Sequence, residues 1–175
     1  MRLLLPVLFL TVAAGGIGLS DAAQGGCRGP SAWTTPSGRP AKLAPDFTLP
    51  PAADAHAKIT LSEVSKEHPV LLIFWATWCP ACVEEIPLLN EWQRKWESRG
   101  LRILSVNVEE PRGRVLQFSR RQKIDYPILL DTDGKVADRF GLVGVPVSIL
   151  LAKGGKIIYY GYSLPDLERT LAQGE

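Results

Sequence analysis

The chain has 175 residues, a formal net charge of +2 and only three cysteines. This length suits one domain with a single core, and three cysteines are too few for a small fold held together by disulfides. Lysine and arginine (20 residues) nearly balance aspartate and glutamate (18 residues), and no basic run is present that tracks a phosphate backbone, so the composition gives nucleic-acid binding no support.

The first 26 residues have the layout of an export signal. Arg2 precedes an apolar run from Leu3 to about Leu19, and small residues follow it. Because this run is nearly long enough to span a bilayer, residues 1–26 are predicted to be either a cleaved signal peptide or a retained membrane anchor. Lipidation of Cys27 is a third option, which Gln24 three positions earlier disfavours. All three options predict a periplasmic or other extracytoplasmic domain, soluble or tethered by its N-terminus.

The segment after the signal predicts a flexible linker over residues 27–40, because it is dense in Gly, Pro, Ser and Thr. The folded domain is predicted over residues 41–175. Apolar residues alternate with smaller or polar ones in APDFTLP (44–50) and AKITLSEV (57–64), which predicts an N-terminal β-hairpin. The continuous apolar run PVLLIFWA (69–76) predicts a central strand covered on both faces.

An amphipathic helix is predicted from Cys79 to Ser98. Its apolar face recurs at spacings of three and four, at Ile86, Leu89, Trp92 and Trp96. Pro80 suits the first turn, where its missing N–H has no partner to lose, and Gly100 ends the helix. Pro87 lies inside the helix and is predicted to kink it.

Strands and helices alternate downstream. Strands are predicted at 101–108, 127–131 and 145–151, and short helices at 111–122 and 134–142. A Gly-Gly turn at 153–156 then leads into a hairpin strand at 157–162, and a helix at 164–171 follows. This order predicts an α/β fold in which helices flank a mixed central sheet.

The chemistry is concentrated in Cys79-Pro80-Ala81-Cys82, where the predicted strand 69–76 gives way to a helix. The unpaired N–H groups and the positive dipole end of a helix lower the pKa of a thiol placed there. Cys79 is therefore the predicted nucleophile. Cys82, one turn into the helix, is suited to attack a mixed disulfide that Cys79 forms with a partner.

Two cysteines at this spacing are also typical of zinc ligands or of buried core residues. The other candidate ligands, His56, His68 and Cys27, lack ligand-like spacing, and no second Cys pair follows. Val83 stands where a haem-attachment motif requires His. We therefore predict no metal and no cofactor other than the redox-active disulfide.

The segment FWATWCPAC, followed by EEIP, resembles the active site of thioredoxin-like proteins, and most closely that of the periplasmic TlpA/ResA-like thiol:disulfide oxidoreductases. The resemblance runs from about Ala44 to Leu171 and includes PDFTL, Trp78, Pro87 and the GVP at 144–146. It implies a thioredoxin fold with an N-terminal β-hairpin extension, and a redox-active Cys79–Cys82 disulfide.

The resemblance also implies roles for residues around the two sulfurs. Pro146 is expected to be a cis proline that leaves the Val145 backbone free to pair with a client peptide, although GVPV by itself favours a strand that starts after a trans bond. Glu85 is expected to take part in proton transfer, although an acid near a helix N-terminus is favourable in any case. Trp78 and Pro80 are expected to contact the client, although aromatic residues at strand ends often only pack in the core.

The resulting functional prediction is a reductase of protein disulfides. By resemblance, its clients are apocytochrome c or copper-site assembly proteins, and a membrane thiol-transfer protein supplies its electrons. Two alternatives are a thiol-dependent peroxidase and a non-catalytic binding module. Peroxiredoxins carry a Pro seven positions and a Thr three positions before their reactive cysteine. At these positions this chain has Leu72 and Ala76. A binding module has no need of both sulfurs.

Overall fold

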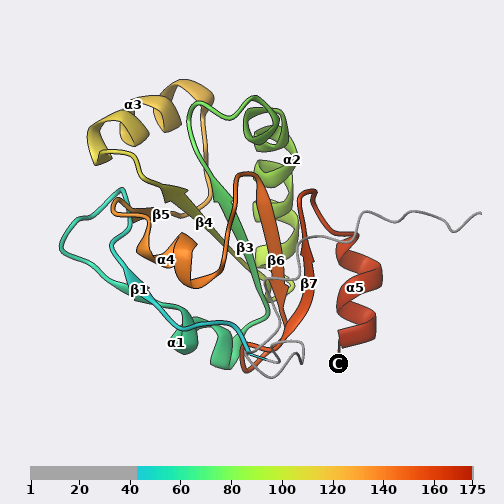
Figure 1. The fold of residues 1–175 in the computed structure, drawn as a ribbon. Helices are drawn as coiled ribbons and strands as arrows, with labels where there is room; N and C mark the ends of the chain where they lie inside the picture. Colours follow the sequence, from blue (N-terminus) through green and yellow to red (C-terminus); the bar gives the residue numbers. More distant parts are fainter. Residues whose placement is uncertain (1–42, 175) are drawn as a thin grey trace, which may run out of the picture.

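The computed structural model describes residues 43–174 (Figure 1). The predicted signal peptide or anchor (1–26), Cys27 and the predicted linker (27–40) lie outside the described residues, so these assignments stay predictions. Within residues 43–174, no helix combines the length and the apolar character needed to cross a bilayer.

A five-stranded mixed sheet forms the centre of the domain, in the order β5-β4-β3-β6-β7. Strand β3 runs parallel to β4 and antiparallel to β6, and β4 runs parallel to β5. The strands are β3 (Val70–Trp75), β4 (Arg102–Val108), β5 (Ile128–Asp131), β6 (Val147–Leu151) and β7 (Ile157–Gly161). This arrangement confirms the predicted mixed sheet and each of its strands.

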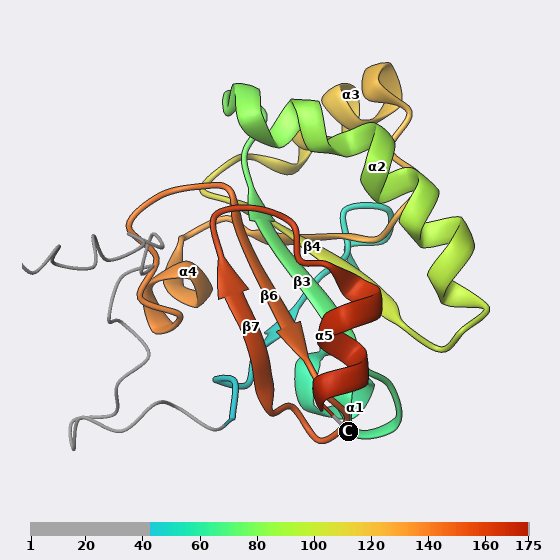
Figure 2. The ribbon, with the colours of Figure 1, turned by 90° about the vertical axis from the view of Figure 1, so that its right-hand side faces the viewer.

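Helices cover both faces of the sheet (Figures 1 and 2). On one face, alternate residues of β3 (Val70, Leu72, Phe74) pack with residues of α1 and α4. On the other face, Leu71 and Ile73 pack with residues of α2 and α5, and Trp75 packs with α2 and α3. The helices are α1 (Leu61–Glu67), α2 (Pro80–Glu97), α3 (Arg112–Gln122), α4 (Lys135–Arg139) and α5 (Leu167–Gly174). Every residue of β3 is buried, which explains its continuous apolar sequence.

The predicted N-terminal hairpin is present but shorter than expected. Strands β1 (Thr48–Leu49) and β2 (Ile59–Thr60) pair antiparallel. The prediction that 57–64 is extended throughout was wrong, because α1 begins at Leu61. Leu61 and Ser65, four positions apart, are both buried, and such spacing is that of a helix face.

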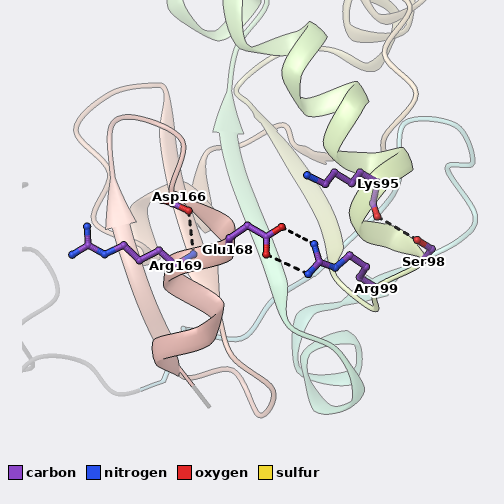
Figure 3. A network of polar contacts seen from close by, with 6 residues as sticks. All are labelled: Lys95, Ser98, Arg99, Asp166, Glu168 and Arg169. Atoms are coloured by element: carbon purple, nitrogen blue, oxygen red, sulfur yellow. Dashed lines mark hydrogen bonds and ion pairs between the residues drawn. The ribbon is translucent and has the colours of Figure 1, made fainter.

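Helix α5 begins three residues later than predicted. The Asp166 side chain accepts a hydrogen bond from the Arg169 backbone N–H (3.1 Å), so Asp166 caps the helix and Leu167 is its first residue. Glu168 of α5 receives two hydrogen bonds from Arg99 (Figure 3), at 2.7 and 3.3 Å. The Arg99 guanidinium also lies 4.0 Å from the centre of the Trp96 ring. These contacts join α5 to the end of α2.

Helix α2 matches its predicted length closely and continues through Pro87. Its axis changes direction along its length (Figure 2), in agreement with the kink that an internal proline is expected to cause. The buried face carries Ile86, Leu89 and Trp96, as the sequence spacing predicts. Helix α2 therefore lies across the sheet with its first turn at the carboxyl end of β3.

Candidate active site

Cys79 and Cys82 form a disulfide at the start of α2, with their Cα atoms 5.3 Å apart. Cys79 is the N-cap residue, and its Sγ accepts a hydrogen bond from the Cys82 backbone N–H (3.2 Å). Pro80 occupies the first helical position, as predicted. A sulfur at this place lies against the positive end of the helix dipole, which stabilises a thiolate once the disulfide is reduced.

The two sulfurs lie at the edge of an apolar cluster and are nearly covered, since each cysteine is 4% exposed. The cluster is built from the end of β3, the start of α2, helix α3 and strand β5, and Val145 packs against it. The peptide bond between Val145 and Pro146 is cis, as the resemblance implies. Trp75 is buried in the same cluster, whereas Trp78 is 66% exposed beside the disulfide.

Glu85 follows Cys82 by less than one turn and is half-buried, whereas its neighbour Glu84 is exposed. The Oε2 atom of Glu85 is buried, and it makes no hydrogen bond within residues 43–174. Desolvation by burial raises the pKa of Glu85 from 4.5 to about 7. The pKa of the buried Tyr126 is also raised, by burial first and then by the charges of Glu85 and Asp125. Glu85 is thus a carboxyl group that can exchange a proton near neutral pH.

A second acid, Glu110, supports the loop before Cys79, although no local pattern in the sequence indicates it. Its carboxylate is buried and accepts hydrogen bonds from the Thr77 backbone N–H (2.7 Å), the Thr77 hydroxyl (2.6 Å) and the Asn107 side-chain amide (2.8 Å). Burial opposes ionisation, but these bonds and the charge of Arg114 outweigh it and lower the pKa of Glu110. Glu110 therefore fixes Thr77, two residues before Cys79, to the carboxyl end of β4.

The predicted site residues fall into one region of the molecule. Cys79, Cys82, Pro80 and Glu85 lie at the start of α2, and Val145 packs against the cluster that contains both sulfurs. In the part of the chain that the structure describes, no three His, Cys, Asp or Glu side chains gather in a way that could hold a metal ion. The reactive groups that this region brings together are the two sulfurs and the nearby carboxyl groups.

A mixed sheet in this order, with a Cys-X-X-Cys disulfide at a helix N-terminus and a cis proline beside it, defines a thioredoxin-like protein. The comparisons with known proteins agree. The chain belongs to the AhpC/TSA family, whose model matches residues 40–160.

Similar proteins include two named thiol-disulfide oxidoreductase ResA. The chain is 34% identical to the one from Geobacillus thermodenitrificans over 114 residues (65% of this chain, 64% of the relative) and 34% identical to the one from Bacillus subtilis over 116 residues (66% and 63%). The aligned part thus spans slightly less than two thirds of these relatives.

Among solved structures, the chain resembles a putative thiol:disulfide interchange protein DsbE from Chlorobium tepidum, with a TM-score of 0.67 and 26% identity, over 76% of this chain and 95% of that one. A putative protein disulfide isomerase from Bacteroides thetaiotaomicron is similar with a TM-score of 0.66 and 25% identity, over 77% and 87%. These likenesses confirm the thioredoxin fold and the resemblance to ResA-like proteins.

Proposed function

We propose that this protein is a thiol:disulfide oxidoreductase that exchanges electrons with disulfides of other proteins through Cys79 and Cys82. One observation carries the proposal: the two sulfurs are within bonding distance at the N-terminus of α2, beside a carboxyl group with a raised pKa. The names of the ResA relatives and of the DsbE-like neighbour support the same reaction class.

In the proposed reaction, the Cys79 thiolate attacks one sulfur of a client disulfide. A mixed disulfide forms between Cys79 and the client, and the first client thiolate leaves and takes a proton. Cys82 then loses its proton, attacks the Cys79 sulfur and expels the second client thiolate. Two electrons pass to the client, whose disulfide becomes a dithiol, and the Cys79–Cys82 disulfide forms.

Glu85 is the proposed acceptor of the Cys82 proton. The two residues are three positions apart on α2 and therefore lie on the same side of the helix. A carboxyl group with a pKa of about 7 is divided between its two protonation states at neutral pH, which is where a general base works best. Thioredoxin carries a buried acid six positions before its first motif cysteine. The corresponding residue here is Ile73 of β3, which is apolar and buried, so it offers no alternative proton acceptor.

The client is proposed to bind over Trp78, Pro80, Val145 and Pro146. Trp78 and Pro80 are exposed next to the disulfide, and the half-buried Val145 and Pro146 lie before β6. A client in extended conformation would pair with the Val145 backbone and bring its own sulfur to Cys79. The apolar Trp78 ring would cover the exchanging sulfurs from water.

We propose reduction as the direction of exchange, in an extracytoplasmic space, with electrons from a membrane thiol-transfer protein. Apocytochrome c and copper-site assembly proteins are the proposed clients. Two features argue against a peroxidase and a binding module. Leu72 and Ala76 are apolar and fully buried where a peroxiredoxin would hold its Pro and Thr, and a binding module would not need both sulfurs.

Replacement of Cys82 by Ser tests the mechanism. Cys79 keeps its ability to attack, but nothing releases the mixed disulfide. Incubation with a disulfide-containing client should therefore give a covalent adduct that dithiothreitol cleaves by reduction. The matched control, Cys79→Ser, should give far less adduct because it lacks the nucleophile. If Cys82→Ser forms no adduct, or if both variants form it equally, the assigned roles are wrong.

A further inference from the structure

Resting on the proposed function, we propose that a docking pocket beside the disulfide selects clients that carry a lysine or arginine next to the reacting cysteine. The docking pocket is lined by residues from four segments, among them Trp78, Glu109, Asp138, Val143, Gly144 and Val145. Two carboxylates at the pocket determine the preference.

The position of the docking pocket follows from the chain. Trp78 directly precedes Cys79, and Gly144 and Val145 directly precede the cis Pro146. A client paired with the Val145 backbone would place a neighbouring side chain in this cavity. The cavity measures about 270 Å³, which is below the ~300–1,000 Å³ typical of small-molecule and cofactor sites. The cavity has room for one long side chain.

The pocket combines apolar walls with negative charge. Trp78 and Val143 are 66% and 81% exposed and present apolar surface at its rim. Glu109 and Asp138 are exposed acids in its lining, and no basic side chain lines it within the part of the chain described. The methylene stem of a lysine or arginine would lie on the apolar rim, with its charged end near the carboxylates.

The backbone around Glu109 directs its carboxylate across the neighbouring turn. Glu109 has a φ of 57°, which is uncommon for any residue but glycine, and its N–H donates to the Asp131 carbonyl at 2.9 Å. Its side chain crosses over Gly134, where an added Cβ would stand only 2.7 Å from Oε1. The absence of a side chain at Gly134 therefore leaves the space that the Glu109 carboxylate occupies.

Charge complementarity identifies the occupant. A lysine or arginine would neutralise the two acids, an acidic side chain would be repelled, and an apolar one would desolvate the carboxylates without pairing them. Because the carboxylates remain partly in water, the expected preference is modest and sensitive to salt.

The test uses three disulfide-linked peptides that differ only in having Lys, Ser or Glu beside the cysteine. In a single turnover of the pre-reduced protein at low salt, the second-order rate constant should be about five times higher for the Lys peptide than for the Glu peptide, with Ser between. The double variant Glu109→Gln, Asp138→Asn should bring this ratio close to one. Glu63→Gln, which removes one charge from the exposed surface of α1 at the other end of the sheet, should keep it.

Two further measurements separate this inference from the proposed function. Reduction of the uncharged bis(2-hydroxyethyl) disulfide reports thiol exchange alone, and its absence in the wild-type protein would refute the proposed function. A Lys peptide with Ser in place of its cysteine cannot react, so its binding, monitored through the NMR chemical shifts of the Trp78 indole, reports docking alone. Equal binding of the Lys and Glu peptides, or a ratio that survives the double variant, would overturn the docking pocket.

Discussion

Glu85→Gln should make the oxidised protein more stable above neutral pH and leave it unchanged in mild acid. Folding raises the pKa of Glu85 from 4.5 to about 7 through burial. Between these values the native state binds more protons than the unfolded state, so the free energy of unfolding falls as pH rises. The full shift is worth about 3 kcal/mol, and because Glu85 is half-buried, solvent screening reduces it to about 1–2 kcal/mol.

The assay is urea unfolding of the oxidised proteins in steps from about pH 4 to about pH 8, which brackets both pKa values. Wild type and Glu85→Gln should agree at the acid end, and the Gln variant should be more stable by about 1–2 kcal/mol at the alkaline end. Glu84→Gln is the matched control, since Glu84 is the exposed neighbour in the same turn, and it should follow the wild-type curve.

The same variant has a kinetic signature in the reduced protein. Loss of the carboxyl group should remove an inflection near neutral pH from the pH dependence of release of the mixed disulfide. If Glu85→Gln follows the wild-type stability curve at every pH, the unfavourable burial of the Glu85 carboxylate is refuted. If Glu85→Gln changes the stability curve as expected but keeps the kinetic inflection, Glu85 is buried as described and another group accepts the proton.

Two further variants test the support of the site and the core. Glu110→Ala leaves both Thr77 donors and the Asn107 amide without their acceptor, so it should lower the free energy of unfolding by about 2–4 kcal/mol in urea at neutral pH. Because the pKa of Glu110 is lowered, this loss should shrink as pH falls below the ordinary carboxyl range. An equal loss at every pH would contradict the assignment of a charged Glu110. Phe140→Ala should lower the free energy of unfolding by about 3–5 kcal/mol, because Phe140 is 1% exposed and contacts the rings of Phe47 and Phe74. A decrease of less than about 1 kcal/mol would contradict this and show that the core collapses around the missing ring.

The elements that the sequence predicts well are those whose pattern is local. Strand β3 is apolar at every position because both of its faces are covered, and the buried face of α2 repeats at three and four residues. The same local logic places Cys79 at the N-cap and Pro80 in the first turn. Where two local patterns overlap, the prediction fails: Leu61 fits both the alternation of the preceding strand and the spacing of the helix that it begins.

The acids that surround the site escaped prediction because their partners are distant in sequence. Glu110 and Thr77 are 33 residues apart, and they meet only because parallel strands β3 and β4 end at the same edge of the sheet. Glu109 and Asp138, which both line the docking pocket, are 29 residues apart. Glu85 is different, since it lies three residues from Cys82 and the resemblance implies its proposed role. Its burial, however, depends on packing that no local pattern shows.

Glu85 and Glu110 differ in a way that assigns each a role. Two carboxyl groups whose environments push their pKa values in opposite directions are suited to different tasks. Glu110 accepts three hydrogen bonds and has a lowered pKa, so it stays ionised throughout exchange and serves to position the loop before Cys79. The Oε2 atom of Glu85 has no hydrogen-bond donor among the described residues, and burial raises the pKa of this group to about 7. Proton transfer during exchange is therefore proposed for Glu85, the acid whose charge the fold leaves uncompensated.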